Sequence, residues 1–291
     1  MRNPFDVDLV DAALVTLPGP WRRVEFHARL PSTNDEIKRH RGTPGWTPSA
    51  DPAAGDGPTV PGCLWRVVLT DHQTGGRGRL GRGWQVPDRA AISMSVTVPV
   101  TGPRDLPWVP LLAGVALSRA VGTVTAAAGT PLTPRLKWPN DVLLDDGGER
   151  KLSGILCGLV GTGPSARVVI GTGVNVDQTR AELPVATATS LALAGAAVRR
   201  EHLVIAYLGE LGRLFTPEAT GEREAGTAAY RQLCATLGRR VRVHLSDGRS
   251  VDGTAVGIGA GAELLVRTPG GQRAFAAGDV EHVRRPDGGL A

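Results

Sequence analysis

The chain has 291 residues, of which 41% are hydrophobic and 21% are charged. These values are ordinary for a soluble globular protein, and the length allows one large domain or one large and one small domain. No run of about 18 apolar residues is present, which argues against a membrane span. The N-terminus, MRNPFDVDLVDAALV, has acids where a secretory signal has basic and apolar regions. We therefore expect a cytoplasmic protein.

The net charge of +5 is compatible with nucleic acid or with an anionic small ligand. The arginines are spread along the chain, whereas a DNA-binding groove needs them clustered. Three cysteines, Cys63, Cys157 and Cys234, lie far apart and form no C-x-x-C pair. This spacing argues against a disulfide framework and against a zinc site.

The first third of the chain predicts strands separated by loops. Ser32 or Thr33 can cap a helix after the first strand, and Glu36 has the spacing for a capping box. Residues 41–62 are rich in Gly, Pro, Ala and Asp, which predicts a long surface loop. A second loop, GGRGRLGRGW at 75–84, is too basic and glycine-rich to be expected in a core. Alternating or continuous apolar residues predict strands at 22–30, 64–70 and 91–100.

The middle of the chain mixes helices with consecutive strands. Small and apolar residues at helical spacing predict a buried helix at 106–129, and an amphipathic helix is predicted at 201–215. DVLLDDGGERKLSGIL predicts a hairpin around Asp146-Gly147-Gly148, and residues 166–176 predict a strand that ends in glycines. The pattern indicates an α+β domain over residues 1–236. From Gly238 on, short strands between S-D-G, G-A-G and P-G-G turns predict a small all-β barrel over residues 237–285.

Lysine and asparagine are rare here and fall in a few motifs. Only three of the 33 basic residues are lysines, and the chain has four asparagines. Because arginine and lysine are not chemically interchangeable, a chain that relies on arginine tends to keep lysine where an ammonium is needed. Two lysines and three asparagines lie in the motifs STN, KWPND, KLSG and GTGVNV, namely Lys137, Lys151, Asn34, Asn140 and Asn175.

Each motif has a chemical and a purely structural interpretation. The Gly/Arg loop predicts an anion cradle, with Trp84 able to stack on a nucleobase, but it also suits an RGG-like nucleic-acid segment or a solvated loop. It matches neither a P-loop nor the G-x-G-x-x-G fingerprint. Asp141 can hold Mg²⁺ or form an Asn-Asp turn. Lys151 can meet an anion or extend to water from a strand end. Gly171 and Gly173 allow close backbone approach or mark a bulge.

The motifs STN, DHQTGGRGRLGRGW, KWPND, KLSGIL and IGTGVNV, in this order, closely resemble the biotin protein ligases. ATSL at 188–191 and AGDVEHVR at 277–284 resemble that family too, so the resemblance runs from about residue 25 to the C-terminus. It implies a class II aminoacyl-tRNA-synthetase-like catalytic domain with a mixed sheet, followed by an SH3-like barrel. It also implies two reactions. Biotin and MgATP give biotinyl-5′-AMP and pyrophosphate, and the biotinyl group then passes to a lysine of a carrier domain.

The resemblance implies roles for particular residues, carried over by motif position. The catalytic residues would be Lys151, Arg77 and Arg79. The biotin-binding set would be Ser32, Thr33, Asn34, Gln73, Gly76, Arg77, Gly78, Arg79, Lys151 and Gly154. The ATP-binding and adenylate-binding set would be Arg77, Arg79, Arg82, Trp84, Lys137, Asn140, Lys151, Gly173 and Asn175. Asp141 would contact Mg²⁺.

The expected partner is the biotin carboxyl carrier domain of a biotin-dependent carboxylase such as acetyl-CoA carboxylase, with biotin and ATP as substrates. Only about thirty residues precede STN, too few for the winged helix-turn-helix that some members carry, so we expect neither operator binding nor repressor activity. No membrane contact is expected, and the chain should be a monomer or a weak homodimer. The alternatives are a lipoate or octanoyl ligase, an inactive homologue and a nucleic-acid-binding module.

Overall fold

The computed structural model describes residues 2–21, 23–39, 65–99, 102–161, 166–216, 218–245 and 247–283. The loop predicted at 41–62 and Cys63 lie outside these residues.

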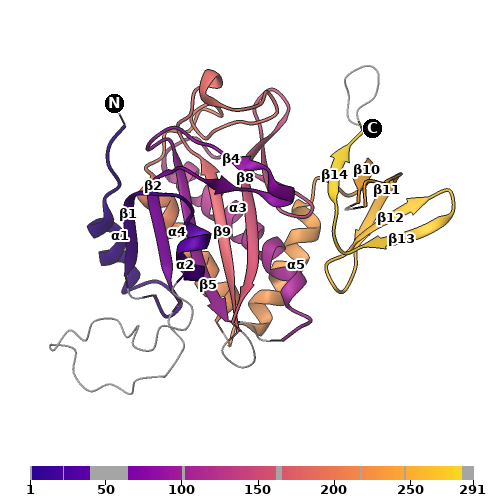
Figure 1. Ribbon diagram of the computed structural model, residues 1–291, viewed down its shortest axis with the longest axis horizontal. Helices are drawn as coiled ribbons and strands as arrows, with labels where there is room; N and C mark the ends of the chain where they lie inside the picture. Colours follow the sequence, from indigo (N-terminus) through magenta and orange to yellow (C-terminus); the bar gives the residue numbers. More distant parts are fainter. Residues whose placement is uncertain are drawn as a thin grey trace.

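A seven-stranded mixed sheet forms the centre of the larger domain (Figure 1). Its strand order is β1-β2-β5-β9-β8-β7-β6, in which β1 and β2 pair in parallel and the other neighbours pair antiparallel. The strands are β1 (Val24–Leu30), β2 (Val67–Gln73), β5 (Ala91–Pro99), β6 (Arg135–Lys137), β7 (Asp141–Asp145), β8 (Glu149–Val160) and β9 (Arg167–Asn175).

Helices cover both faces of this sheet. The main core joins one face to α3, α4 and α1, whereas α2 packs on the opposite face over a small cluster that includes Ile37 and Val68. The neighbouring strands β9 and β8 lie in the middle of the sheet, and β9 contacts α2. Their glycines Gly154, Gly171 and Gly173 are called the glycine floor below. The helices are α1 (Val7–Leu14), α2 (Thr33–Arg39), η2 (Leu106–Trp108), α3 (Val109–Ala127), η4 (Arg180–Glu182), α4 (Arg200–Phe215) and α5 (Thr220–Leu233).

The longest helix is apolar on nearly every face. Together with η2, α3 is long and apolar enough to cross a membrane by length and composition alone, but 67% of its most apolar window is buried inside the protein. A helix packed between a sheet and two further helices needs apolar residues all round, so this is the pattern of a core helix.

The C-terminal residues form an all-antiparallel sheet of five strands in the order β13-β12-β11-β10-β14, drawn in yellow in Figure 1. Two buried tryptophans of the larger domain fix its position. The indole N–H of Trp138 donates to the carbonyl of Ala262 at 3.0 Å, and that of Trp108 donates to the carbonyl of Ala260 at 2.8 Å. The strands are β10 (Arg240–His244), β11 (Ser250–Ile258), β12 (Leu264–Thr268), β13 (Gly271–Phe275) and β14 (Asp279–His282).

The α+β class and the all-β C-terminal part are confirmed, and so is the hairpin around residues 146–148. Two expectations are wrong. The Gly/Arg loop is a short hairpin of β3 (Gly76–Arg77) and β4 (Gly83–Trp84), and its tryptophan packs on the sheet. The capping box does not form, because the N–H of Thr33 donates to Gln73 at 3.1 Å while the carboxylate of Glu36 pairs with Arg39.

Candidate active site

The floor of the candidate site consists of glycines that make room for predicted ligand-binding side chains. A Cβ at Gly173 would overlap the indole of Trp84, and a Cβ at Gly171 would overlap the amide of Asn34. At Gly154 it would lie 3.2 Å from the Lys151 ammonium, tighter than a normal contact. The glycines of β8 and β9 therefore let these three side chains lie close to the sheet. The sequence predicted such a close approach to the backbone at Gly171 and Gly173.

A buried polar network joins α2 to β2 and β5. The Thr33 hydroxyl donates to Gln73 Oε1 at 3.3 Å, and the Ser95 hydroxyl lies 2.7 Å from both Thr33 Oγ1 and Asn34 Oδ1. The Asn34 amide nitrogen donates to the carbonyl of Leu156 on β8 at 3.3 Å. Three residues of the predicted biotin-binding set, Thr33, Asn34 and Gln73, are thus held by one network. Ser32, also predicted, caps α2 by accepting from the Asp35 N–H at 3.2 Å.

Lys151 lies at the point where three segments meet. Its ammonium is 2.6 Å from Asp141 Oδ1 at the start of β7. Its backbone N–H donates to Thr187 at 2.8 Å, and its carbonyl accepts from Thr189 at 2.9 Å. The ATSL segment therefore extends the sheet beside KLSG and holds the lysine in place. The structure gives Asp141 an ion pair with this lysine, so its predicted metal contact stays a prediction.

The arginines of the hairpin point in three directions. Arg79 donates to Asn140 Oδ1 at 3.4 Å, which brings the hairpin to the KWPND motif. Burial lowers the pKa of the Arg79 guanidinium despite the nearby carboxylates of Asp279 and Asp141. The positive charge of this guanidinium is therefore only partly balanced by its neighbours, which favours the binding of an anion beside it. Arg77 is largely exposed and lies 3.6 Å from Asp35, whereas Arg82 pairs with Asp279 of the C-terminal domain.

The remaining predicted residues lie at the margins of this site. Asn175 is 4% exposed, and its amide nitrogen donates to Thr189 at 2.9 Å while its oxygen accepts from Gln178 at 2.8 Å. Asn175 therefore holds the ATSL segment, which in turn holds Lys151. Its effect on a bound nucleotide would be indirect, through the position of Lys151. Lys137 lies on the side of the C-terminal domain, where its charge adds to burial in lowering the pKa of His282. Gly78 fixes the hairpin, since its N–H donates to the carbonyl of Arg82 at 2.7 Å.

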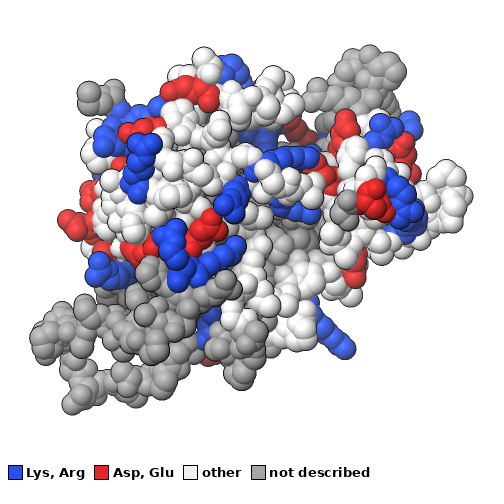
Figure 2. All heavy atoms as spheres, viewed as in Figure 1, with Lys and Arg blue, Asp and Glu red and all other residues white. Residues whose placement is uncertain are grey.

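Basic side chains surround this region of the surface. Figure 2 shows Lys and Arg gathered near the centre of the face that carries the β3–β4 hairpin in Figure 1. Arginines 77 and 82 contribute side chains that are 69% and 65% exposed. Both have an acidic neighbour, so their charge is partly balanced. Such a surface attracts a polyanionic substrate.

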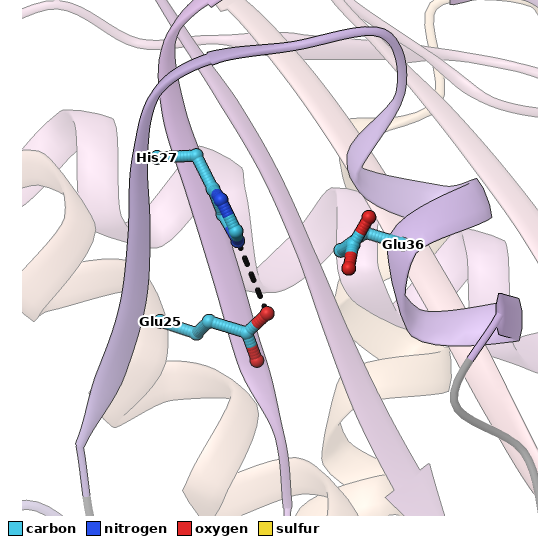
Figure 3. Close-up of side chains that lie close together, drawn as sticks. All are labelled: Glu25, His27 and Glu36. Atoms are coloured by element: carbon cyan, nitrogen blue, oxygen red, sulfur yellow. Dashed lines mark hydrogen bonds and ion pairs between the residues drawn. The ribbon is translucent and has the colours of Figure 1, made fainter.

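A second cluster contains possible metal ligands. Glu25 and His27 on β1 face Glu36 on α2, and one ligand atom of each lies within 4.8 Å of the others (Figure 3). Both carboxylates are already paired, Glu25 with Arg66 at 2.5 Å and Glu36 with Arg39. Burial alone would raise the pKa of Glu25, but hydrogen bonds from Arg66 and His27 hold it below its ordinary value. The cluster therefore consists of two sets of ion pairs, one within α2 and one on the side of the sheet, and its carboxylates already have cationic partners.

Two residues of the site were missed from the sequence. Ser95 is fully buried at 0% exposure and links two predicted residues, Thr33 and Asn34. A signal was available, because alternation in the strand AISMSVTVPV places Ser93, Ser95 and Thr97 on one face, opposite the apolar face. Asp279 reaches the hairpin from β14 through Arg82. Nothing in the sequence order connects those two residues, because they are 197 positions apart.

Comparison with known proteins agrees with this geometry. Residues 65–175 match the profile of the biotin/lipoate A/B protein ligase family, and residues 236–283 match the biotin protein ligase C-terminal domain. The biotin–[acetyl-CoA-carboxylase] ligase of Mycobacterium tuberculosis is 33% identical over 98% of each chain. The bifunctional ligase/repressor BirA of Escherichia coli is 31% identical over 74% of this chain and 65% of its own length.

Solved structures show the same fold. The biotin protein ligase of Aquifex aeolicus in complex with biotin and ATP aligns with a TM-score of 0.63 at 22% identity, covering 89% of this chain and 97% of that one. The Leishmania major biotin protein ligase in complex with biotin aligns with a TM-score of 0.54 at 25% identity, covering 87% and 98%.

Proposed function

We propose, from the premise that this chain belongs to the biotin protein ligase family, that it activates biotin with ATP to biotinyl-5′-AMP and passes the biotinyl group to a lysine of a carrier domain. The observation that carries the proposal is that Lys151 and Trp84 meet over Gly154, while Arg79 lies near Asp141, the ion-pair partner of Lys151. Two of these side chains come from the Gly/Arg hairpin, and the third comes from the KLSG motif.

The first reaction has an electrostatic difficulty that this site can relieve. A carboxylate must attack a phosphate, and the two anions repel one another in water. The Lys151 ammonium and the Arg79 guanidinium both lie near Asp141, where together they would neutralise both groups and hold them in line. Asp141 holds the ammonium at 2.6 Å before substrate arrives. Trp84 lies on the floor beside Lys151, with a buried indole N–H that has no hydrogen-bond partner among the described residues.

The nucleotide and the acceptor are further parts of the proposal. ATP would enter with Mg²⁺, for which carboxylates and substrate phosphates are the usual ligands. Asp141 offers a carboxylate beside the proposed phosphate position, in competition with its lysine partner. The mixed anhydride must be shielded from water, and the β3–β4 hairpin covers the place where it would form. The acceptor would be the carrier domain of a biotin-dependent carboxylase, the class of protein that the name of the mycobacterial relative implies.

The test is ATP–pyrophosphate exchange by the purified full chain with Mg²⁺, with and without biotin, and with lipoate in a parallel reaction. We expect exchange that requires biotin. The Lys151→Ala variant should lose roughly 100-fold or more in exchange rate, because a positioned charge at the reacting atoms disappears. Exchange with lipoate instead of biotin would transfer the proposal to the lipoate ligases. Folded protein that exchanges with neither acid would contradict it.

A further inference from the structure

The residues before α1 cross the end of the sheet at which β2 and β9 finish, and buried groups hold them there. The Arg200 guanidinium donates to the carbonyl of Asn3 at 2.8 Å and to the carboxylate of Asp71 at 2.6 Å. The same carboxylate accepts from the N–H of Phe5 at 3.3 Å. Because Arg200 and Asp71 are almost completely buried, these bonds are shielded from water. Arg2, at the start of this stretch, is therefore held in a defined place.

The Arg2 guanidinium forms a fork on the segment that follows β9. Its two terminal nitrogens donate to the two carboxylate oxygens of Glu182 at 3.0 and 2.7 Å. Its Nε lies 2.7 Å from Asp177 Oδ1, and one terminal nitrogen also donates to the Asp177 carbonyl at 3.1 Å. Glu182 in turn accepts from the N–H of Thr179 at 2.9 Å, which completes a capping box. One side chain thus fixes both ends of residues 177–182, called the η4 turn below.

The η4 turn is joined to the ATSL segment by two direct hydrogen bonds. The Ser190 hydroxyl donates to the carbonyl of Gln178 at 2.7 Å. The Arg180 guanidinium donates to the carbonyl of Ala188 at 2.9 Å. The ATSL segment is also the one that pairs with the backbone of Lys151. A continuous set of hydrogen bonds and ion pairs therefore leads from the residues before α1 to the lysine of the candidate site.

We propose that Arg2 is a positioning residue for the adenylation reaction, because through the η4 turn and ATSL it holds the strand position of Lys151. The lysine ammonium must meet both reacting anions, and a misplacement of about 1 Å can cost about 100-fold in rate. Arg2 contacts partners 175 and 180 positions away, so no sequence motif marks it. This inference rests on the proposed function and extends the catalytic unit to the residues before α1.

Removal of the Arg2 side chain should open the η4 turn. The carboxylates of Asp177 and Glu182 lie close enough to repel one another, and Arg2 bridges them. Without this bridge two like charges would face each other, with Arg200 as the remaining nearby cation. Arg200 is already paired with Asp71 at 2.6 Å, so its charge does not replace the fork.

Hydrogen exchange of backbone amides, followed by mass spectrometry, tests this role without requiring activity. The N–H groups of Lys151 and Thr189 connect residues 187–189 to β8. In Arg2→Ala both should exchange about tenfold faster than in wild type, while the amides of α3 keep their wild-type rates. The kcat of biotin-dependent ATP–pyrophosphate exchange should fall about tenfold. Arg2→Lys should restore part of both losses, because lysine keeps the charge but not the fork.

Arg199→Ala is the matched control. Arg199 also contacts a residue before α1, since it lies 3.5 Å from Asp6, and it lies 3.4 Å from Glu201. Among the described residues it has no hydrogen bond or ion pair with the η4 turn. This variant should keep wild-type amide exchange and wild-type kcat.

Three results would overturn the role of Arg2. They are unchanged amide exchange at Lys151 and Thr189 in Arg2→Ala, faster exchange there with an unchanged kcat, and an equal acceleration throughout α3, which would indicate a general loss of stability. Wild-type protein without biotin-dependent ATP–pyrophosphate exchange would instead remove the proposed function. The amide measurement would then still show whether Arg2 holds the segment around Lys151.

Discussion

At the scale of single residues, Gly173 shows how the floor and the hairpin depend on one another. Any side chain at this position would overlap the indole of Trp84. Gly173→Ala should therefore displace the tryptophan and raise the KM for ATP about tenfold or more, because a misplaced contact of this kind weakens substrate positioning. Exchange kinetics at varied ATP concentration measure the change.

Gly158→Ala is the control for this prediction. Gly158 lies on the neighbouring strand β8, and a Cβ there would meet Lys38 Cε at an ordinary 3.7 Å. It should keep wild-type kinetics. An unchanged KM for ATP in Gly173→Ala would show that Trp84 can lie elsewhere without loss.

The sequence predicted most residues of the candidate site because they are rare or lie in glycine-rich motifs, but it did not predict their contacts. Lys151 was predicted to meet an anion, and in the structure its ammonium contacts Asp141. The two residues become neighbours because β7 pairs with β8, which the sequence order alone does not show. Ser95 belongs to a common residue type, so nothing in its frequency marks it. Ser95 belongs to the site because three strands and a helix lie close together there. The periodicity of a single strand gives no information about such distances.

At the scale of elements, the tip of the β3–β4 hairpin is strained. Leu80 has φ 56° and ψ 32°, and the next residue, Gly81, has φ 73°. The N–H of Arg82 closes the turn on the carbonyl of Arg79 at 3.2 Å. A two-residue turn with both residues at positive φ strongly prefers asparagine or glycine, and a leucine there is unfavourable.

Leu80→Asn should raise the free energy of unfolding by about 0.5–1 kcal/mol, because asparagine tolerates positive φ. Thermal unfolding should show a Tm higher by about 2–4 °C per kcal/mol in a chain of this size. Leu80→Ala removes the same apolar side chain, which is 66% exposed, but keeps the strained backbone. It should give no gain, and an equal gain from both variants would assign the effect to the exposed side chain.

Element prediction succeeded where one periodicity dominated and failed where it was absent. The long strands β5, β8 and β9 and the helices α3 and α4 have clear apolar patterns. In contrast, α5 faces the core with Gly226, Ala229, Tyr230 and Leu233, a stripe at helical spacing in which two of the four residues are small, so its apolar signal is weak. The Gly/Arg hairpin has two-residue strands, too short for any period, and depends on a turn that its sequence disfavours.

At the scale of the whole molecule, the two domains meet at a buried polar junction. His282 of β14 lies 3.1 Å from Thr236 Oγ1, which also accepts from the backbone N–H of Trp138 at 3.1 Å. Arg239, paired with Glu149 of the catalytic domain, lies 3.3 Å from His282 Nδ1. Because an arginine can only donate, Nδ1 must accept, and the ring is neutral in the folded protein.

This junction should weaken in acid. Burial, with the charges of Lys137 and Arg239, lowers the pKa of His282 from 6.5 to about 3. Between these values the unfolded chain binds a proton that the folded chain does not, so stability falls as the pH drops below about 6.5. From pH 7 to pH 5 the loss attributable to this group should be about 2 kcal/mol.

His282→Gln should remove that part of the loss, because a glutamine can accept from Arg239 and donate to Thr236 without titrating. Urea unfolding at pH 7 and pH 5 measures the difference. His244→Gln is the control, since among the described residues this histidine, with a side chain 43% exposed, hydrogen-bonds within the C-terminal sheet, to Ser250 at 2.9 Å and Glu281 at 3.4 Å. It should retain the wild-type loss. If His282→Gln lost as much stability in acid as wild type, the domain junction would not be the acid-sensitive part of the molecule.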